Sequence, residues 1–430
     1  MSAPGAAPTR PEPDRYFPCI DGLRAAAALL VLVFHVAGPT GVNRGTTWVA
    51  DYTNQFGRLG VSIFFAISGF LLYRPFALAH LGGAPSPRVG PYLRRRFLRI
   101  FPAYWLALLG WTVLGSAAVR SGILDHLLLR VSLLQGYSQA KDGNVPLALS
   151  GVEVAWTLTI ELTFYLVLPL YAWAIRRLGG ALGRGQQLTA EWLGLGVLYV
   201  IGITGRYLLA EDVLPIGALF PWTDLFAMGM LIAVVRARQK TGGPTPALFR
   251  YLGRYPLLGL LLALELVWVV AQLDVARGYA EKSLGDEFAR HLCYGFVGFL
   301  LLAPLVFGNQ DRTTYRRFLR TRPVRWTGEV SYGIYLWHFL VMRLVLERWT
   351  DLTFWPLLGA TFAVTFVIAS LSFVLLERPV QRLRLHRLLP SSGRRPVPGG
   401  EDGEGATGPD GRGGGSRAAA PTSTRGGPPP

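Results

Sequence analysis

Ten apolar stretches of roughly 20 residues follow one another along the chain and are separated by polar loops. A helix of about this length matches the hydrocarbon thickness of a bilayer. The pattern therefore predicts an all-α integral membrane protein with about ten transmembrane helices in one bundle. The predicted spans cover residues 20–38, 57–80, 98–119, 153–175, 191–210, 214–235, 252–272, 288–308, 329–347 and 353–377.

The chain outside these stretches is expected to contribute little to the bundle. Residues 1–18 lack the apolar core of a signal peptide and are predicted to form a flexible tail. Residues 389–430 are rich in Gly and Pro and are predicted to be disordered, which leaves residues 19–388 as the transmembrane domain. One further stretch, residues 122–137 ("GILDHLLLRVSLLQGY"), is interrupted by charges and fits either an interfacial or a re-entrant segment.

Basic residues are distributed unevenly over the loops. With the N-terminus in the cytoplasm, the segments on that side hold 27 Lys and Arg, and those on the opposite side hold 11. This asymmetry follows the positive-inside rule and predicts a multi-pass protein of the cell membrane with both termini in the cytoplasm. The net charge of +17 has the same origin, because arginines gather at the ends of the apolar stretches, and no nucleic-acid partner is expected.

The first span contains an arginine and a histidine between apolar residues. Arg24 and His35 are eleven residues apart, so they share one face of a helix and are separated by a rise of about 16 Å. Ionisable side chains inside a membrane are costly and usually serve a function. The structural alternative is an arginine that reaches the interface and a histidine that is hydrogen-bonded to another helix.

A second basic group opens the third span, in "PYLRRRFLRIFPAYW". Arg96 and Arg99 are three residues apart and project from one helical face, where two guanidinium groups can clamp a phosphate. Simple anchoring by the positive-inside rule is the alternative for this run. The sequence alone does not separate the two.

Polar positions also interrupt later spans. Thr157, Glu161 and Tyr165 recur every four residues in the fourth span and predict a polar seam facing the bundle interior. In the ninth span, "SYGIYLWHFLV" contains Tyr335 and His338, which fit either a site or an aromatic belt at the membrane interface.

The motifs taken together resemble those of the bacterial membrane acyltransferase 3 family. They occur in the family's order between about residues 18 and 384, and they read "DGLRAAAALLVLVFH", "GVSIFFAISGFLLYRPF", "RRFLRIFPAYW", "WTLTIELTFY", "SYGIYLWH" and "LLERP". The resemblance implies a ten-helix core with an arginine–ten residues–histidine motif at Arg24 and His35. It also implies an arginine-x-x-arginine motif at Arg96 and Arg99.

The activity implied by the resemblance is transfer of an acyl group to a hydroxyl of a carbohydrate or small natural product, such as a cell-envelope glycan or a macrolide. Two positions depart from the family pattern. Ser62 stands where many members carry an aspartate, and Leu162 replaces an acid that often follows Glu161. Neither departure removes the Arg24–His35 motif.

Acyl transfer from a thioester to an alcohol needs a base for the hydroxyl and donors for the developing oxyanion. A neutral histidine suits the first role, so His35 is the leading catalytic candidate, together with Glu161. The expected donor is cytoplasmic acyl-CoA, a substrate whose phosphates would bind Arg24, Arg96 and Arg99; no bound cofactor and no metal is expected. Further side chains expected to line the site are Ser68, Tyr165, Tyr335 and His338.

A ten-helix secondary transporter of a small polar solute is the competing class of protein. It would also bury polar groups, but inverted repeats with broken helices at matching positions are typical of it. The sequence shows no such pairing. Binding of acyl-CoA separates the two classes.

Orientation can be tested with reporter tags at residue 1 and after residue 390. Because the basic segments lie on one side of the predicted spans, both tags should report the cytoplasm. Protease protection in intact cells measures this directly. Digestion of either tag from outside the cell would contradict the assigned orientation.

Overall fold

The computed structural model describes residues 16–44, 47–138, 141–142, 145–146, 150–183, 185–210, 214–277, 284–309 and 312–386. The predicted C-terminal tail lies outside these residues, as does the predicted N-terminal tail apart from residues 16–18. The described chain is helical except for its loops and one minimal antiparallel sheet. Its strands are β1 (Lys141–Asp142) and β2 (Val145–Pro146).

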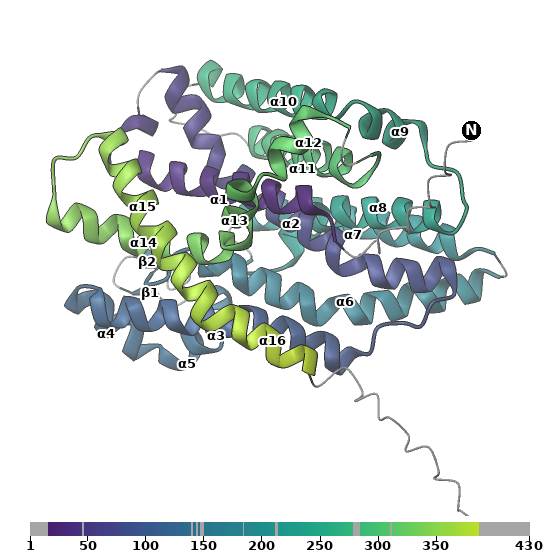
Figure 1. Cartoon of the computed structure of the whole chain (residues 1–430), viewed down its shortest axis with the longest axis horizontal. Helices are drawn as coiled ribbons and strands as arrows, with labels where there is room; N and C mark the ends of the chain where they lie inside the picture. The colour runs from purple at the N-terminus through teal and green to yellow at the C-terminus, as the bar shows by residue number, and fades with distance from the viewer. Residues whose placement is uncertain are drawn as a thin grey trace, which may run out of the picture. The chain divides into compact units, whose positions relative to one another are not determined.

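Ten long helices form the bundle (Figure 1). They are α1 (Pro18–Ala37), α2 (Trp48–Gly82), α3 (Val89–Leu114), α6 (Ala155–Leu182), α7 (Gln187–Ala210), α8 (Thr223–Lys240), α10 (Pro256–Arg277), α11 (Leu284–Val306), α14 (Ser331–Arg348) and α15 (Phe354–Ser372). Each coincides with one predicted span. The expectation of an all-helical membrane protein with about ten spans is confirmed.

Shorter elements join the long helices. They are α4 (Ala117–Asp125), α5 (Leu127–Val131), α9 (Ala247–Arg254), α12 (Thr314–Leu319), α13 (Arg322–Glu329), α16 (Arg378–His386), a π-helical turn η5 (Phe373–Glu377) and the 3-10 turns η1 (Val42–Arg44), η2 (Gln135–Tyr137) and η4 (Phe220–Trp222). Helix α9 meets α10 at an angle of 101°.

By length and composition, eight helices of the described chain can cross a membrane, and the bent pair of α9 and α10 makes nine. Helix α14 is not one of these helices, because three charged residues fall within its last six positions: Arg343, Glu347 and Arg348. It nevertheless packs along α1 and α15. The predicted span at 329–347 is therefore a helix of the bundle that carries its charges at one end.

Helix α2 begins nine residues before the predicted start at residue 57. Thr47 caps it by accepting the backbone N–H of Ala50, and polar residues follow in its first two turns. Gln55 is 1% exposed, and its side chain donates to the carbonyl of Asp51 and accepts from the hydroxyl of Tyr294. Buried polar side chains whose hydrogen bonds are made within the protein allow a helix to continue where the hydropathy pattern predicts a loop.

The stretch at 122–137 turns back along α3. The Tyr104 hydroxyl donates to the carbonyl of Arg130 at 2.6 Å, and the Trp105 indole N–H donates to the carbonyl of the next residue at 3.0 Å. The guanidinium of buried Arg130 donates to the carbonyl oxygen of Ser150 at 2.6 Å and to the hydroxyl of Ser150 at 2.7 Å. Because Tyr104 lies midway along α3, the stretch reaches the middle of that helix.

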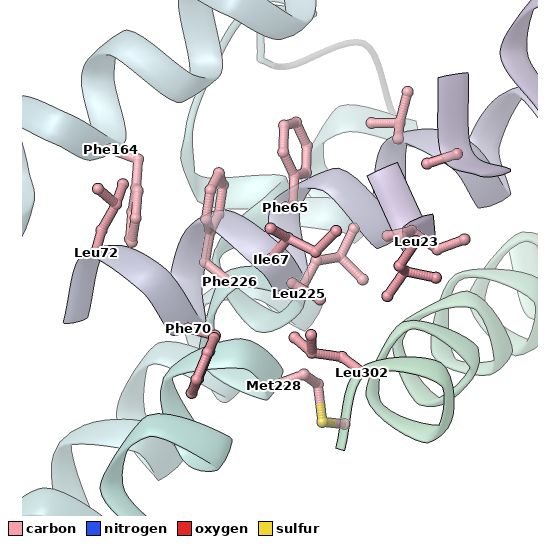
Figure 2. Close-up of a cluster of buried hydrophobic side chains, with 14 of the residues drawn as sticks. Leu23, Phe65, Ile67, Phe70, Leu72, Phe164, Leu225, Phe226, Met228 and Leu302 are labelled. Carbon is pink, nitrogen blue, oxygen red and sulfur yellow. The ribbon is translucent and has the colours of Figure 1, made fainter. Parts of the chain in front are cut away.

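The core centres on the contact between α2 and α8. The ring of Phe226 stacks on Phe65 and Phe164, with centroids 4.6 and 4.0 Å apart, as Figure 2 shows. The backbones also approach closely: a Cβ on Gly229 would stand 1.9 Å from the carbonyl oxygen of Ala66. Small residues at such a crossing allow the van der Waals contact that holds membrane helices together.

Gly229→Ala should destabilise the bundle. The added methyl group would meet backbone rather than a movable side chain, so the expected loss is about 3 kcal/mol, at the upper end for overpacking. Thermal unfolding in detergent measures it. Gly196→Ala in α7 is the matched control, since nothing lies within 4 Å of its Cβ position. A Gly229→Ala variant as stable as this control would contradict the packing argument.

Candidate functional site

A cavity lies where α1, α2, α3, α6 and α14 meet. Apolar side chains form much of its wall, and charged and hydroxyl-bearing side chains converge on it. Most of the predicted site residues are among its lining: Arg24, Ser68, Arg96, Arg99, Glu161, Tyr165 and Tyr335. The structure therefore brings together residues that are separated by up to about 300 positions in the sequence.

Three guanidinium groups enter this cavity from two helices. Arg24 comes from α1, and its Nη1 forms an ion pair with Asp21 at 3.1 Å. Arg96 and Arg99 come from the first half of α3, and the guanidinium of Arg96 lies 5.8 Å from the ring centroid of Tyr165. The two motifs seen in the sequence thus face one space.

Glu161 provides the only carboxylate among the described residues that line the cavity. Its Oε1 accepts from the hydroxyls of Ser68, at 2.6 Å, and Tyr165, at 2.5 Å. Thr157 lines the same cavity one turn away, so the predicted polar seam faces the bundle interior as expected. Glu161 therefore lies in the same cavity as the three arginines.

Tyr335 closes one end of the cavity. Its hydroxyl shares a hydrogen bond with Thr157 Oγ1 at 2.8 Å, which joins α14 to α6. The ring of Phe64, from α2, lies 5.9 Å from the Tyr335 ring. We refer to Phe64, Tyr335 and Thr157 as the aromatic layer.

The two predicted histidines form a pair next to this layer. His338 Nε2 lies 3.1 Å from His35 Nδ1, and their ring centroids are 4.9 Å apart. The Tyr335 ring lies 6.0 Å from that of His338. Neither histidine is among the residues that line the cavity, so the structure places the pair next to Tyr335 rather than in the cavity wall.

Hydrogen bonds define the tautomers of the neutral pair. The Nδ1 of His338 faces the carbonyl of Ile334 at 3.0 Å, and the Nδ1 of His35 faces that of Val31 at 2.9 Å. Carbonyl oxygens only accept, so both Nδ1 atoms carry the hydrogen. The Nδ1–H of His35 is then shared with the free Nε2 of His338. This arrangement leaves a lone pair on His35 Nε2, which no described residue engages.

A second cavity adjoins the first and shares Arg24, Arg99 and Tyr332 with it. Asp21, Glu329 and Glu377 line its wall together with one further arginine. The hydroxyl of nearby Tyr16 donates to Asp21 at 2.6 Å. Burial and this hydrogen bond raise the pKa of Tyr16 to about 12, so the phenol remains a donor at neutral pH. We call this second cavity the vestibule.

Glu377 was not predicted as a site residue. It is 6% exposed, and its Oε1 has no hydrogen-bond partner in the described part of the chain. It ends the π-helical turn η5, a distortion that is frequent at functional sites. The available signals were an acid at the end of an apolar run and its place in the "LLERP" motif.

Two buried contacts between a histidine and a carboxylate lie outside both cavities and were also missed. His80 Nδ1 meets Glu191 at 2.6 Å between α2 and α7, and His291 Nε2 meets Asp224 at 2.8 Å between α11 and α8. Each ties two long helices together. Within the described residues, no group of three or more His, Cys, Asp or Glu side chains is placed to hold a metal ion.

Comparison with protein families agrees with the arrangement of these motifs. The model of the acyltransferase 3 family, described as an acyltransferase domain, matches residues 17–376. The chain belongs to the acyltransferase 3 family. Its long apolar helices accordingly make it a multi-pass protein of the cell membrane.

Several curated relatives of this acyltransferase 3 chain match most of its length. Peptidoglycan O-acetyltransferase OatA of Listeria monocytogenes is 26% identical over 393 residues, which is 86% of this chain and 56% of that protein. Nodulation protein 10 of Rhizobium leguminosarum bv. viciae is 30% identical over 386 residues, 85% of this chain and 93% of that protein. Acyltransferase MdmB of Streptomyces mycarofaciens is 26% identical over 397 residues, 85% and 92% respectively.

The chain thus spans little more than half the length of the Listeria protein and nearly the full length of the other two. No solved structure matches the chain.

Proposed function

We propose that this chain is a membrane O-acyltransferase that moves an acyl group from cytoplasmic acyl-CoA to a hydroxyl of a carbohydrate or small natural product. The observation that carries the proposal is one cavity with three arginines and a single carboxylate, separated by a thin aromatic layer from a histidine with a free ring nitrogen. Family membership supports the reaction class.

The donor is proposed from charge and shape. Acyl-CoA combines several phosphates with a long, uncharged pantetheine arm. Arg24, Arg96 and Arg99 outnumber the carboxylate in the cavity, and guanidinium groups bind phosphate oxygens through paired hydrogen bonds. The rise of about 16 Å from Arg24 to His35 along α1 is comparable with the reach of the pantetheine arm.

His35 is proposed as the general base. Its Nε2 would take the proton of the acceptor hydroxyl while the hydroxyl oxygen attacks the thioester carbonyl. The tetrahedral intermediate then collapses, the C–S bond breaks, and the leaving thiolate of CoA takes the proton from His35 Nε2, which returns the imidazole to its neutral form. His338 acts as a positioning residue, because its Nε2 accepts the Nδ1–H of His35 and stabilises the ring when it becomes positively charged.

The thioester has to pass the aromatic layer to reach His35. Rotation of the Phe64 or Tyr335 side chain would open a path through the aromatic layer. Without substrate, the hydrogen bond between Tyr335 and Thr157 would keep this path closed. The cost of breaking such a bond is on the order of 1 kcal/mol, which binding of a donor can supply.

The acceptor is proposed as a class only. The Listeria relative is named for O-acetylation of peptidoglycan, a polymer whose sugars present hydroxyls. This supports a sugar hydroxyl as the acceptor, with a hydroxyl of a natural product such as a macrolide as the other member of the class. A transporter of a polar solute is the competing class, and binding of acyl-CoA separates the two.

Arg96→Ala and Arg99→Ala should each weaken acyl-CoA binding by about tenfold or more, because each removes a charged contact to a phosphate. The loss should be larger at low salt, where such contacts are screened least. Calorimetric titration of the purified protein measures both. Arg94→Ala and Arg95→Ala are matched controls from the same basic run that do not line the cavity. Equal losses of affinity in all four variants would mean that Arg96 and Arg99 do not bind the donor specifically and serve only to orient the helix in the membrane.

His35→Gln should lower the rate of acyl transfer by about 100- to 10,000-fold while leaving acyl-CoA affinity nearly unchanged. Glutamine preserves hydrogen bonding but cannot accept the proton, and the donor's phosphates are held elsewhere. Turnover and donor binding are measured on the same preparation, with His126→Gln as a control histidine outside the pair. Near wild-type turnover of His35→Gln would assign the base to another group, with Glu161 and His338 as the candidates.

A further inference from the structure

A separate basic cavity lies where α9, the end of α11 and α12 meet, and it shares no lining residue with the first cavity or the vestibule. These three helices lie together at the upper right of Figure 1. Arg250, Arg254, Arg312 and Arg316 line this cavity. No Asp or Glu occurs among its described lining residues.

Arg316 forms the floor of this cavity and is 1% exposed. Its two Nη atoms donate to four backbone carbonyls, among them those of Gly253 at 2.8 Å and Asn309 at 2.7 Å. The Nε has no partner among the described residues, and no described carboxylate forms an ion pair with the side chain. The guanidinium is therefore held rigidly by neutral groups and keeps its full charge.

A buried cation without an anion is costly, because dipoles replace only part of the lost hydration. Burial accordingly lowers the pKa of Arg316. An anion in the adjoining cavity would supply the missing negative charge. It would also meet the exposed guanidinium groups of Arg250, Arg254 and Arg312 at the rim, and Thr245 offers a hydroxyl there.

The surroundings favour an anion with hydrocarbon chains. Helix α9 turns through 101° into α10, and Tyr251 and Tyr255 at this bend are 60% and 50% exposed, as side chains of a membrane–water interface are. Directly after the bend, Leu257 and Leu261 of α10 are 54% and 62% exposed. A basic pocket at the interface, continuous with an exposed apolar helix, matches the two parts of a phospholipid.

We propose that this cavity binds the phosphate headgroup of an anionic phospholipid, with the acyl chains lying along the exposed leucines of α10. The geometry that carries the proposal is a fully buried arginine, three rim arginines and an adjacent lipid-exposed helix. Since α12 also touches the start of α1, where Leu319 meets Gly22, a bound lipid would brace the helix that carries Arg24 and His35.

Native mass spectrometry of the detergent-solubilised full chain, titrated with phosphatidylglycerol or phosphatidylcholine, tests this proposal. The wild type should bind phosphatidylglycerol at least about tenfold more tightly than phosphatidylcholine. Arg250→Gln combined with Arg254→Gln should remove this preference, because both rim contacts are lost. Arg317→Gln combined with Arg322→Gln removes the same charge from exposed positions outside the cavity and should retain it.

Three results would overturn the proposal. One is an unchanged preference for phosphatidylglycerol in the Arg250→Gln, Arg254→Gln variant, and another is an equal loss in the control variant. The third is displacement of the lipid by inorganic phosphate or by CoA, which would make a soluble phosphate the occupant. Acyl-transfer activity is not used as a readout, so the outcome is independent of the proposed enzymatic function.

Discussion

An excess of positive charge inside an apolar bundle is the constraint on which the rest of this structure depends. Three arginines and a single carboxylate line one cavity, and the carboxylate already accepts two hydroxyl hydrogen bonds. Such charges are tolerated within a membrane only where water or a ligand reaches them. The adjoining vestibule, which shares Arg24 and Arg99, provides that access. An anionic ligand is therefore the natural complement of the cavity, and the helices around it serve to hold the arginines at a fixed spacing.

That spacing relies on a rigid frame on one side of the cavity. Helices α2 and α8 are in backbone contact through Gly69 and Gly229, and the stacked rings of Phe65, Phe164 and Phe226 fill the space beside them. Helices α1, α3, α6 and α14 complete the wall, and the hydrogen bond that joins Thr157 to Tyr335 connects two of them across the cavity. Close packing and polar seams thus occupy different parts of the same helices.

Sequence patterns predicted the spans and much of the cavity, because length, apolarity and four-residue spacing are local properties. Arg24, Arg96, Arg99 and Glu161 were identified in this way, and they line one space. The pairing of His35 with His338 could not be predicted, since the two are 303 positions apart and one sequence carries no information on which helices are neighbours. The early start of α2 could not be predicted, because the buried side chain of Gln55 accepts a hydrogen bond from Tyr294, which is distant in the sequence. The packing of residues 122–137 along α3 depends on hydrogen bonds to backbone carbonyls. Every residue has such a carbonyl, so the sequence does not indicate which ones are used.

The aromatic layer has a further consequence in the proposed mechanism, which concerns the electric field across the membrane. Water in the cavity would be at the electric potential of the side of the membrane from which it enters. The transmembrane voltage would then drop over the short distance across Phe64 and Tyr335 rather than over a full bilayer. His35 lies just beyond this layer, and a proton taken up there would be a charge moved within that field. Each elementary charge crossing 100 mV corresponds to about 2.3 kcal/mol. In the proposed mechanism, the membrane potential would therefore contribute to the free energy of the intermediate in which His35 is protonated.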